Sequence, residues 1–219
     1  MINKGFGDLV QYPDEFIQPN RTKFAEDPFS YSIFARHKWG LAQETAGFPA
    51  DLEAPPTNDE LKSPVLWLTH ARAMSLAAVT VLRTEPAFDA MPDLLKGVCD
   101  SQYCAVGLML VGYSLEICLK GMLIIQKGVS QYSEDERLHR HHRLEELADF
   151  VPELSAKDKA ILRTLTHFIT WAGRYPDPGS GQPEKIEEIF STAEQYQICA
   201  RDLFNLAGRV MAHAKHVIE

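Results

Sequence analysis

The sequence has little cysteine, and its four cysteines follow no disulfide pattern. They are spread over 219 residues, form no Cys-x-x-Cys pair, and stand at Cys99, Cys104, Cys118 and Cys199. A small disulfide-stapled domain needs denser cysteines on its loops. We therefore expect reduced thiols, as is typical of a cytoplasmic protein. The first three fall in one predicted helix, where we expect them to be buried as small apolar side chains.

The first residues also lack the apolar core, roughly 7–15 residues long, that marks a secretory signal. One later segment, Val106–Ile125, is twenty residues long and largely apolar. It carries Glu116 and Lys120 near its middle, and charged side chains are costly inside a lipid bilayer. We expect this segment to be a buried helix of a bundle rather than a membrane span.

An excess of positive charge is missing as well. The chain has 22 Lys and Arg against 30 Asp and Glu, with a formal net charge of −8. Because phosphate binding relies on clustered positive charge, this balance excludes a general nucleic-acid coat and leaves room for a local basic site. The GxSxG, HExxH, Walker and GxGxxG motifs are absent. We accordingly predict no cofactor and no metal.

Helical periodicity dominates what is present, and no stretch alternates convincingly between apolar and polar residues. The predicted fold is all-α, a helical bundle of about five main helices (residues 61–219) preceded by an irregular arm and short helix (residues 1–60). Helices are expected over 31–44, 64–83, 98–127 (ending at Gly128), 142–150, 156–169 (capped by Ser155) and 184–217. Irregular structure is expected over 1–29 (an extended arm), 45–60, 129–141 and 173–183.

Glu116 and Lys120 stand four residues apart on the most apolar predicted helix. Glutamate precedes lysine, which is the better orientation for a pair within a helix. Two interpretations follow. The pair lies on an exposed stripe of the helix, or it lines a polar groove between helices, because charges deep inside a protein need partners.

The segment Arg137–Arg143 holds three arginines and three histidines, preceded by three acidic residues. His139 and His142 would be three apart on a helix and could bind a metal, but no further ligand stands at a recognisable spacing. A solvated connection, or a basic patch that touches phosphate, are the other interpretations.

The segment Trp171–Pro176 places Trp171, Arg174 and Tyr175 at a helix end. An arginine beside aromatic rings can pair with a phosphate while a ring stacks on a base. Alternatively, the rings cover the end of the bundle and Arg174 meets the last helical carbonyls.

Taken in order, these features resemble the HEPN superfamily over about residues 64–217. The resemblance rests on Gly112-Tyr-Ser-Leu-Glu-Ile-Cys-Leu-Lys120 in the central helix, Gly128 at its end, His142-Arg-Leu-Glu-Glu-Leu147, a further helix, Arg174-Tyr-Pro176 and a long last helix. It implies a small helical bundle, usually dimeric, tied to RNA or nucleotide chemistry. Some members are metal-independent ribonucleases of toxin–antitoxin and phage-defence systems, and others are non-catalytic partners of nucleotidyltransferases.

The nucleases of that superfamily carry an Arg-x(4–6)-His motif that acts at the scissile phosphate in a dimer cleft. Two such spacings occur here, from Arg137 to His142 and from Arg209 to His216. Neither stands near the front of the later helices, where the family's nucleases place the motif. His167 lies closer to that region, but only three residues separate it from the arginine before it. This departure favours a member that does not cut RNA.

We therefore predict a cytoplasmic, homodimeric HEPN-like domain that binds a nucleotide or RNA without catalysis. Its partner would be a nucleotidyltransferase or an antitoxin. The predicted binding residues, gathered along one groove beside the central helix, are Glu116, Lys120, His142, Arg174 and Tyr175. One alternative is a metal-independent ribonuclease that uses His142 or His167 for acid–base work. The other is a structural module that docks a protein through apolar faces.

Overall fold

The computed structural model describes residues 18–218, and every regular element in that range is helical. The predicted all-α class is confirmed. Five of these helices have twelve or more residues: α6 (Pro64–Arg83), α7 (Asp93–Lys127), α11 (Ala156–His167), α12 (Glu184–Gln195) and α13 (Ala200–Ile218). The chain divides into two compact units, Met1–Leu66 and Trp67–Glu219.

The described part of the first unit is more helical than predicted. Its helices are α2 (Arg21–Glu26), α3 (Pro28–Ile33), α4 (Ala35–Thr45) and α5 (Asn58–Leu61). The extended arm predicted for residues 1–29 is therefore wrong from residue 21 onward, and residues 1–17 lie outside the described residues. The signals were caps: Asn20 and Asp27 accept backbone N–H groups at the starts of α2 and α3, and Pro28 occupies the first turn of α3.

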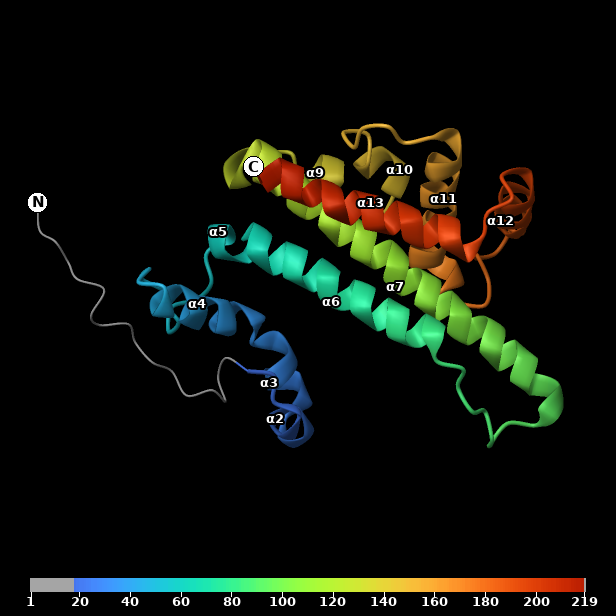
Figure 1. Ribbon diagram of the computed structural model, residues 1–219, viewed down its shortest axis with the longest axis horizontal. Coiled ribbons are helices and arrows are strands. Elements are labelled where there is room, and N and C mark those ends of the chain that lie inside the picture. The colour runs from blue at the N-terminus through green and yellow to red at the C-terminus, as the bar shows by residue number, and fades with distance from the viewer. Residues whose placement is uncertain (1–17, 219) are drawn as a thin grey trace, which may run out of the picture. The chain divides into compact units, whose positions relative to one another are not determined.

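The second unit is built around α7 (Figure 1). Helix α13 packs along α7, and α11 together with the π-helical turn η1 (Phe168–Ala172) also contacts it. The large side chains with no exposed surface come from these elements and from α10 (Leu144–Leu147): Leu115, Leu119, Met122, Leu144, Leu162, Ile169, Leu206 and Val210. Gly128 ends α7 with a φ of 77°, as predicted.

Helices α6 and α7 approach closely where α7 carries glycine. A Cβ on Gly107 would lie 2.5 Å from Leu82 Cδ2, and one on Gly121 would lie 3.2 Å from Leu68 Cδ2. The first turns of α7 are exposed, with Leu94 at 94%. The predicted burial of the cysteines in this helix is therefore wrong for the exposed Cys104 and the half-buried Cys99, and it holds for Cys118.

Two segments are long and apolar enough to cross a membrane by length and composition alone. They are α7 and Asn58–Arg83, with mean hydropathies of 1.8 and 1.5 over their most apolar windows. Burial inside the bundle covers 61% of the α7 window and 11% of the other. For α7, the packing around its second half accounts for the apolar composition. The segment Asn58–Arg83 was not singled out in the sequence.

The single last helix predicted over 184–217 is wrong, because the chain turns between α12 and α13. Gln197 adopts a φ of 46°, the N–H of Ile198 donates to the carbonyl of Ala193, and the N–H of Gln197 donates to Glu194. This is the helix-ending pattern that usually places glycine at the left-handed position. Since glutamine stands there, the sequence carried no visible stop signal.

The polar connection predicted over 129–141 contains two short helices, α8 (Val129–Glu134) and α9 (Glu136–His139). The helix predicted over 142–150 is shorter than expected, since only α10 is helical there. His142 and Arg143 thus lie on the bend between α9 and α10, which leads the chain back onto α7 and α11.

Candidate functional site

At the C-terminal end of α11, the regular α-helical hydrogen bonding gives way to the π-helical turn η1. Helix α11 starts at a capping box, in which Ser155 and Asp158 satisfy each other's backbone N–H groups, and it continues into η1. In η1, the N–H of Gly173 donates to the carbonyl of Phe168, 3.0 Å away, instead of to Ile169. The Ile169 carbonyl is thereby released from the helix. Such π turns recur at functional sites because they free backbone groups in this way.

Glycines let this turn lie directly on α7. A Cβ on Gly173 would stand 2.4 Å from Met109 Cβ and 3.0 Å from the carbonyl oxygen of Ala105. A Cβ on Gly112 would stand 2.5 Å from Ile169 Cγ2. Real Cβ atoms essentially never come as close as 2.4 or 2.5 Å to another heavy atom, so a side chain at either position would push η1 away from α7. The close approach brings the Ile169 carbonyl to the α7 side chains.

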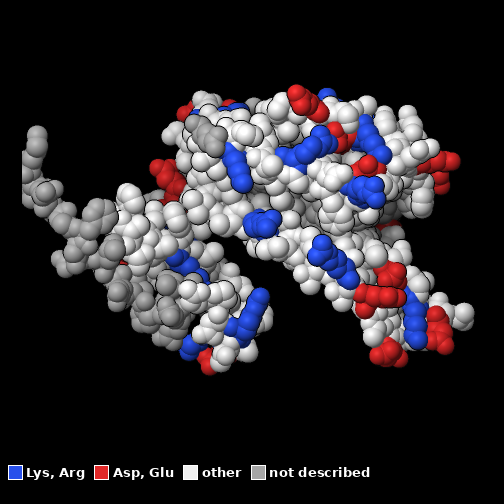
Figure 2. Space-filling view, viewed as in Figure 1, with Lys and Arg blue, Asp and Glu red and all other residues white. Residues whose placement is uncertain are grey.

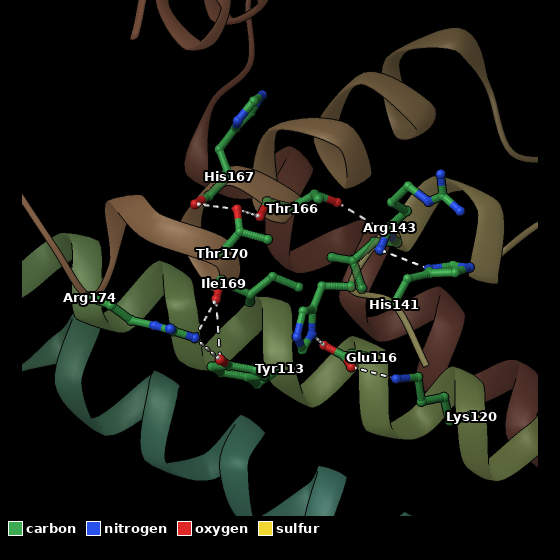
Figure 3. Close-up of polar contacts among 12 residues, drawn as sticks. Tyr113, Glu116, Lys120, His141, Arg143, Thr166, His167, Ile169, Thr170 and Arg174 are labelled. Carbon is green, nitrogen blue, oxygen red and sulfur yellow. Dashed lines mark hydrogen bonds and ion pairs between the residues drawn. The ribbon is translucent and has the colours of Figure 1, made fainter. Parts of the chain in front are cut away.

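Tyr113 of α7 joins the freed carbonyl to Arg174. Its hydroxyl donates to the Ile169 carbonyl at 3.2 Å and accepts a hydrogen bond from Arg174 Nη1 at the same distance (Figure 3). The guanidinium also lies over the ring of Tyr175, 5.2 Å from its centroid, and Tyr175 itself is exposed. One surface arginine is thus held by two tyrosines at the end of η1.

Glu116, one turn further along α7, is the buried centre of the site. Glu116 is 5% exposed, and its two carboxylate oxygens have different hydrogen-bond partners. Lys120 Nζ donates to Oε1 at 2.7 Å, and His142 Nδ1 lies 2.9 Å from Oε2. The Lys120 side chain is 11% exposed, and that of His142 is 45% exposed. Both oxygens of this buried carboxylate are therefore hydrogen-bonded, as a buried charged group requires.

The Glu116 carboxylate also determines the tautomer of His142. An ionised carboxylate can only accept hydrogen bonds, so Nδ1 of His142 carries the proton in this contact. Nε2 is then the unprotonated nitrogen of the neutral ring, and it has no hydrogen-bond partner within residues 18–218. The ring also lies edge-on to Tyr113, with centroids 6.2 Å apart. Such a carboxylate–histidine pair orients an imidazole for taking up a proton or meeting a ligand.

Backbone contacts hold the histidine bend in place. The N–H of Leu144 donates to Thr166 Oγ1 of α11 at 3.1 Å, and the Leu144 side chain is fully buried. The N–H of Arg143 donates to Nδ1 of His141. Partial burial lowers the pKa of His141, and the positive charge of Arg143 lowers it further. Leu144 therefore anchors the bend that carries His142 to the core.

All five predicted binding residues lie on this one network. Glu116, Lys120 and His142 are joined by hydrogen bonds, and Arg174 and Tyr175 are joined to each other. Tyr113 connects the two groups by a hydrogen bond from Arg174 and an edge-on ring contact with His142. Of the two interpretations of the Glu116 and Lys120 pair, the exposed stripe is wrong, because both side chains are largely buried. Arg174 meets a helical carbonyl, as one interpretation had it, with Nη1 lying 3.5 Å from that of Ile169.

Tyr113 is the residue of the network that sequence reasoning missed. It was quoted only as part of a motif, and a tyrosine in an apolar helix gives no sign of a specific partner. A signal was nevertheless present: Tyr113 stands three residues before Glu116, which places both on one face of a helix.

His167 is placed differently from His142. Its Nε2 lies 3.3 Å from Oε2 of Glu188, and its Nδ1 accepts from Trp171 Nε1 at 3.4 Å. The ring points away from Glu116 and Tyr113 (Figure 3). The two histidines predicted for the ribonuclease alternative therefore do not share a site.

The structure does not support the interpretation of His139 and His142 as metal ligands. His139 stacks on Tyr132 and contacts Lys127, whereas His142 contacts Glu116. No cluster of three or more histidine, cysteine or acidic side chains within residues 18–218 could hold a metal ion.

The predicted groove was expected to hold the site residues, but the two cavities that can be described lie elsewhere. They have volumes of about 500 and 330 Å³ and are lined by residues of the first unit, among them Tyr31, His37 and Leu52. The network has the buried carboxylate of Glu116 at its base, and Arg174 and Tyr175 at its other end are exposed. On the face shown in Figure 2, positive side chains stand among acidic ones and form no continuous basic surface.

Comparison with known proteins adds no relative. No family model, no curated protein and no solved structure matches the chain.

Proposed function

We propose that the second unit is a HEPN-like domain that binds the phosphate of a nucleotide or RNA at the network around Glu116, without cutting it. The proposal keeps the predicted homodimer and the predicted partner, a nucleotidyltransferase or an antitoxin, in a cytoplasmic setting. Its main support is the convergence of Lys120, His142 and Arg174 from three separate segments. Lys120 and His142 share the buried carboxylate of Glu116, and Arg174 bonds to the hydroxyl of Tyr113, whose ring lies edge-on to His142.

The chemistry of these groups suits a phosphate. Arg174 offers a planar fork of donors, and Lys120 supplies a further positive charge close to His142. Tyr175 is 56% exposed and presents a ring on which a base could stack. Glu116 holds Lys120 and His142 in position and does not face the ligand itself, because it is buried beneath them.

The test measures binding of adenosine 5′-monophosphate and of a short single-stranded RNA to the full chain. Arg174→Ala should weaken both by tenfold to about a hundredfold, since a hydrogen bond to a charged group contributes about 1.5–3 kcal/mol. Helical content by circular dichroism should stay unchanged, because Arg174 is exposed. Arg201→Ala, at an exposed arginine outside the network, is the matched control. Equal binding by the two variants would remove Arg174 from the site.

One observation favours a second candidate, a metal-independent ribonuclease with a divergent motif. The Glu116 carboxylate leaves Nε2 of His142 unprotonated, as in a general base. Purified protein incubated with mixed RNA in a chelator would then cleave it, and His142→Ala would lose cleavage. His167→Ala should keep cleavage, because both ring nitrogens of His167 have partners. Cleavage that survives in His142→Ala would reject this candidate.

A further inference from the structure

A neutral His142 ring cannot donate a hydrogen bond to a phosphate. Its Nδ1 proton points to Oε2 of Glu116, 2.9 Å away, so a neutral ring offers a lone pair at Nε2. The oxygens of an ionised phosphate are also acceptors. Two acceptors repel each other, so a phosphate that contacts Nε2 must bring a proton to it. The doubly protonated ring would then donate to Glu116 and to the phosphate together.

The charges of the network set a preferred ligand charge. Lys120 and Arg174 are cations, and the Glu116 carboxylate offsets one of them. With His142 protonated, the site carries two net positive charges. A terminal phosphate monoester carries close to two negative charges near neutral pH. A phosphodiester within a nucleic-acid strand carries only one.

The surroundings of His142 leave it as the group that takes the proton. Helix α7 presents Glu116, Lys120 behind it, and the ring of Tyr113, which leads to Arg174 of the η1 end. On the histidine bend itself stand His141 and Arg143, and α10 presents Glu146, which contacts both of these. Of the two histidines on the bend, partial burial and then the charge of Arg143 lower the pKa of His141, so His142 is the one placed to take the proton.

We propose that this network recognises a terminal phosphate monoester, as found on a nucleoside monophosphate or a phosphorylated RNA end, and takes up one proton on His142 when it binds. This inference rests on the proposed phosphate-binding function. It adds the class of phosphate and a proton that accompanies the ligand.

The experiment is isothermal titration calorimetry of the full chain at about pH 7.5, in two buffers that differ in ionisation enthalpy. Adenosine 5′-monophosphate should bind with uptake of about one proton, the one that Nε2 of His142 needs in order to donate to the phosphate. Adenosine 3′,5′-cyclic monophosphate, a diester with the same base and one charge, should bind at least about tenfold more weakly. A 5′-phosphorylated RNA and its unphosphorylated form then show whether an RNA end serves as the source of the phosphate.

His142→Gln tests the proton. The glutamine amide can still donate to Glu116, so the chain should fold, while proton uptake should disappear. His70→Gln, at an exposed histidine of α6, should keep the full uptake. A measurement that needs no variant is the affinity of the unaltered chain. It should fall by about tenfold per pH unit between pH 7.5 and 8.5 if one proton is taken up.

The outcomes separate this inference from the proposed function. Equal affinities for the monoester and the cyclic diester, or unchanged proton uptake in His142→Gln, would overturn the inference and leave phosphate binding standing. No binding of the nucleotide or of either RNA would overturn the proposed function itself.

Discussion

Replacing Glu116 by glutamine tests the electrostatics of the buried network most directly. Glutamine keeps the size and shape of the side chain and removes its charge. The Lys120 ammonium, whose side chain is 11% exposed, then loses its counter-ion in a place that water barely reaches. Removing one partner of a buried pair costs about 3–5 kcal/mol. Since Lys120 keeps some exposure and His142 keeps an acceptor in the amide oxygen, we expect about 2–4 kcal/mol.

A change of this size is easily measured. Domain stabilities are about 5–15 kcal/mol, so Glu116→Gln should remove a substantial share. For a chain of this length the midpoint temperature should fall by about 4–16 °C, at about 2–4 °C for each kcal/mol. Urea unfolding followed by circular dichroism gives the free energy of unfolding. Glu194→Gln, at an exposed glutamate of α12, should change it by less than about 0.5 kcal/mol.

A double variant separates charge from packing. In Glu116→Gln with Lys120→Met, both charges are gone, and methionine fills the space of the lysine stem. Replacing a buried pair by an uncharged one is often neutral or stabilising, so the double variant should be more stable than Glu116→Gln alone. Equal stability of Glu116→Gln and Glu194→Gln, or no recovery on adding Lys120→Met, would show that an unpaired Lys120 does not destabilise the fold.

Three further predictions concern packing, acid stability and thiol reactivity. Gly173→Ala should lower the thermal midpoint sharply, because the new Cβ has no room against α7. Gly208→Ala should instead stabilise α13 by up to about 1 kcal/mol, because no atom lies within 4 Å of the new Cβ. Burial raises the pKa of Asp158, but hydrogen bonds from Ser155 and Arg209 outweigh it and lower the pKa below its ordinary 3.8. Asp158 therefore stabilises the fold above about pH 4 and loses this effect as the pH falls further, so urea unfolding of Asp158→Asn should be less sensitive to acid than that of the unaltered chain. Burial raises the pKa of Cys118 to about 11. In a thiol-reagent assay at pH 8, Cys118 should therefore react only after unfolding, while the exposed cysteines react in the native state. A native Cys118 that reacts as fast as the exposed cysteines would contradict its burial.

Local chemistry explains which elements could be predicted. The start of α6 at Pro64, the end of α7 at Gly128 and the Ser155 cap of α11 each depend on one or two neighbouring residues. They were read correctly because proline, glycine and serine act on the backbone beside them. The break at Gln197 was missed because its left-handed conformation is imposed by the turn and not by the residue type. The helices over 21–33 were missed because prolines outweighed the caps at Asn20 and Asp27 in the prediction.

The five proposed binding residues could be chosen from the sequence because charged or paired groups in an apolar setting demand partners. Glu116 in a buried helix, the histidines after it and Arg174 between aromatic rings each stood out by residue type. Which of them would touch could not be read in the same way. His142 is 26 residues from Glu116, and Arg174 is 61 residues from Tyr113, so no helical spacing relates them.

The amino-acid order by itself determined an all-helical chain, the boundaries set by its strongest caps, and a shortlist of polar groups in apolar surroundings. Those features arise between neighbours along the backbone, where a residue type acts over a few positions. The tertiary structure alone decided that Tyr113 bridges two halves of one network, that His167 lies outside it, and that the Ile169 carbonyl is free to accept. These depend on how closely α7 and η1 approach, and that distance is set by the packing of Gly112 and Gly173 against side chains far away in the chain.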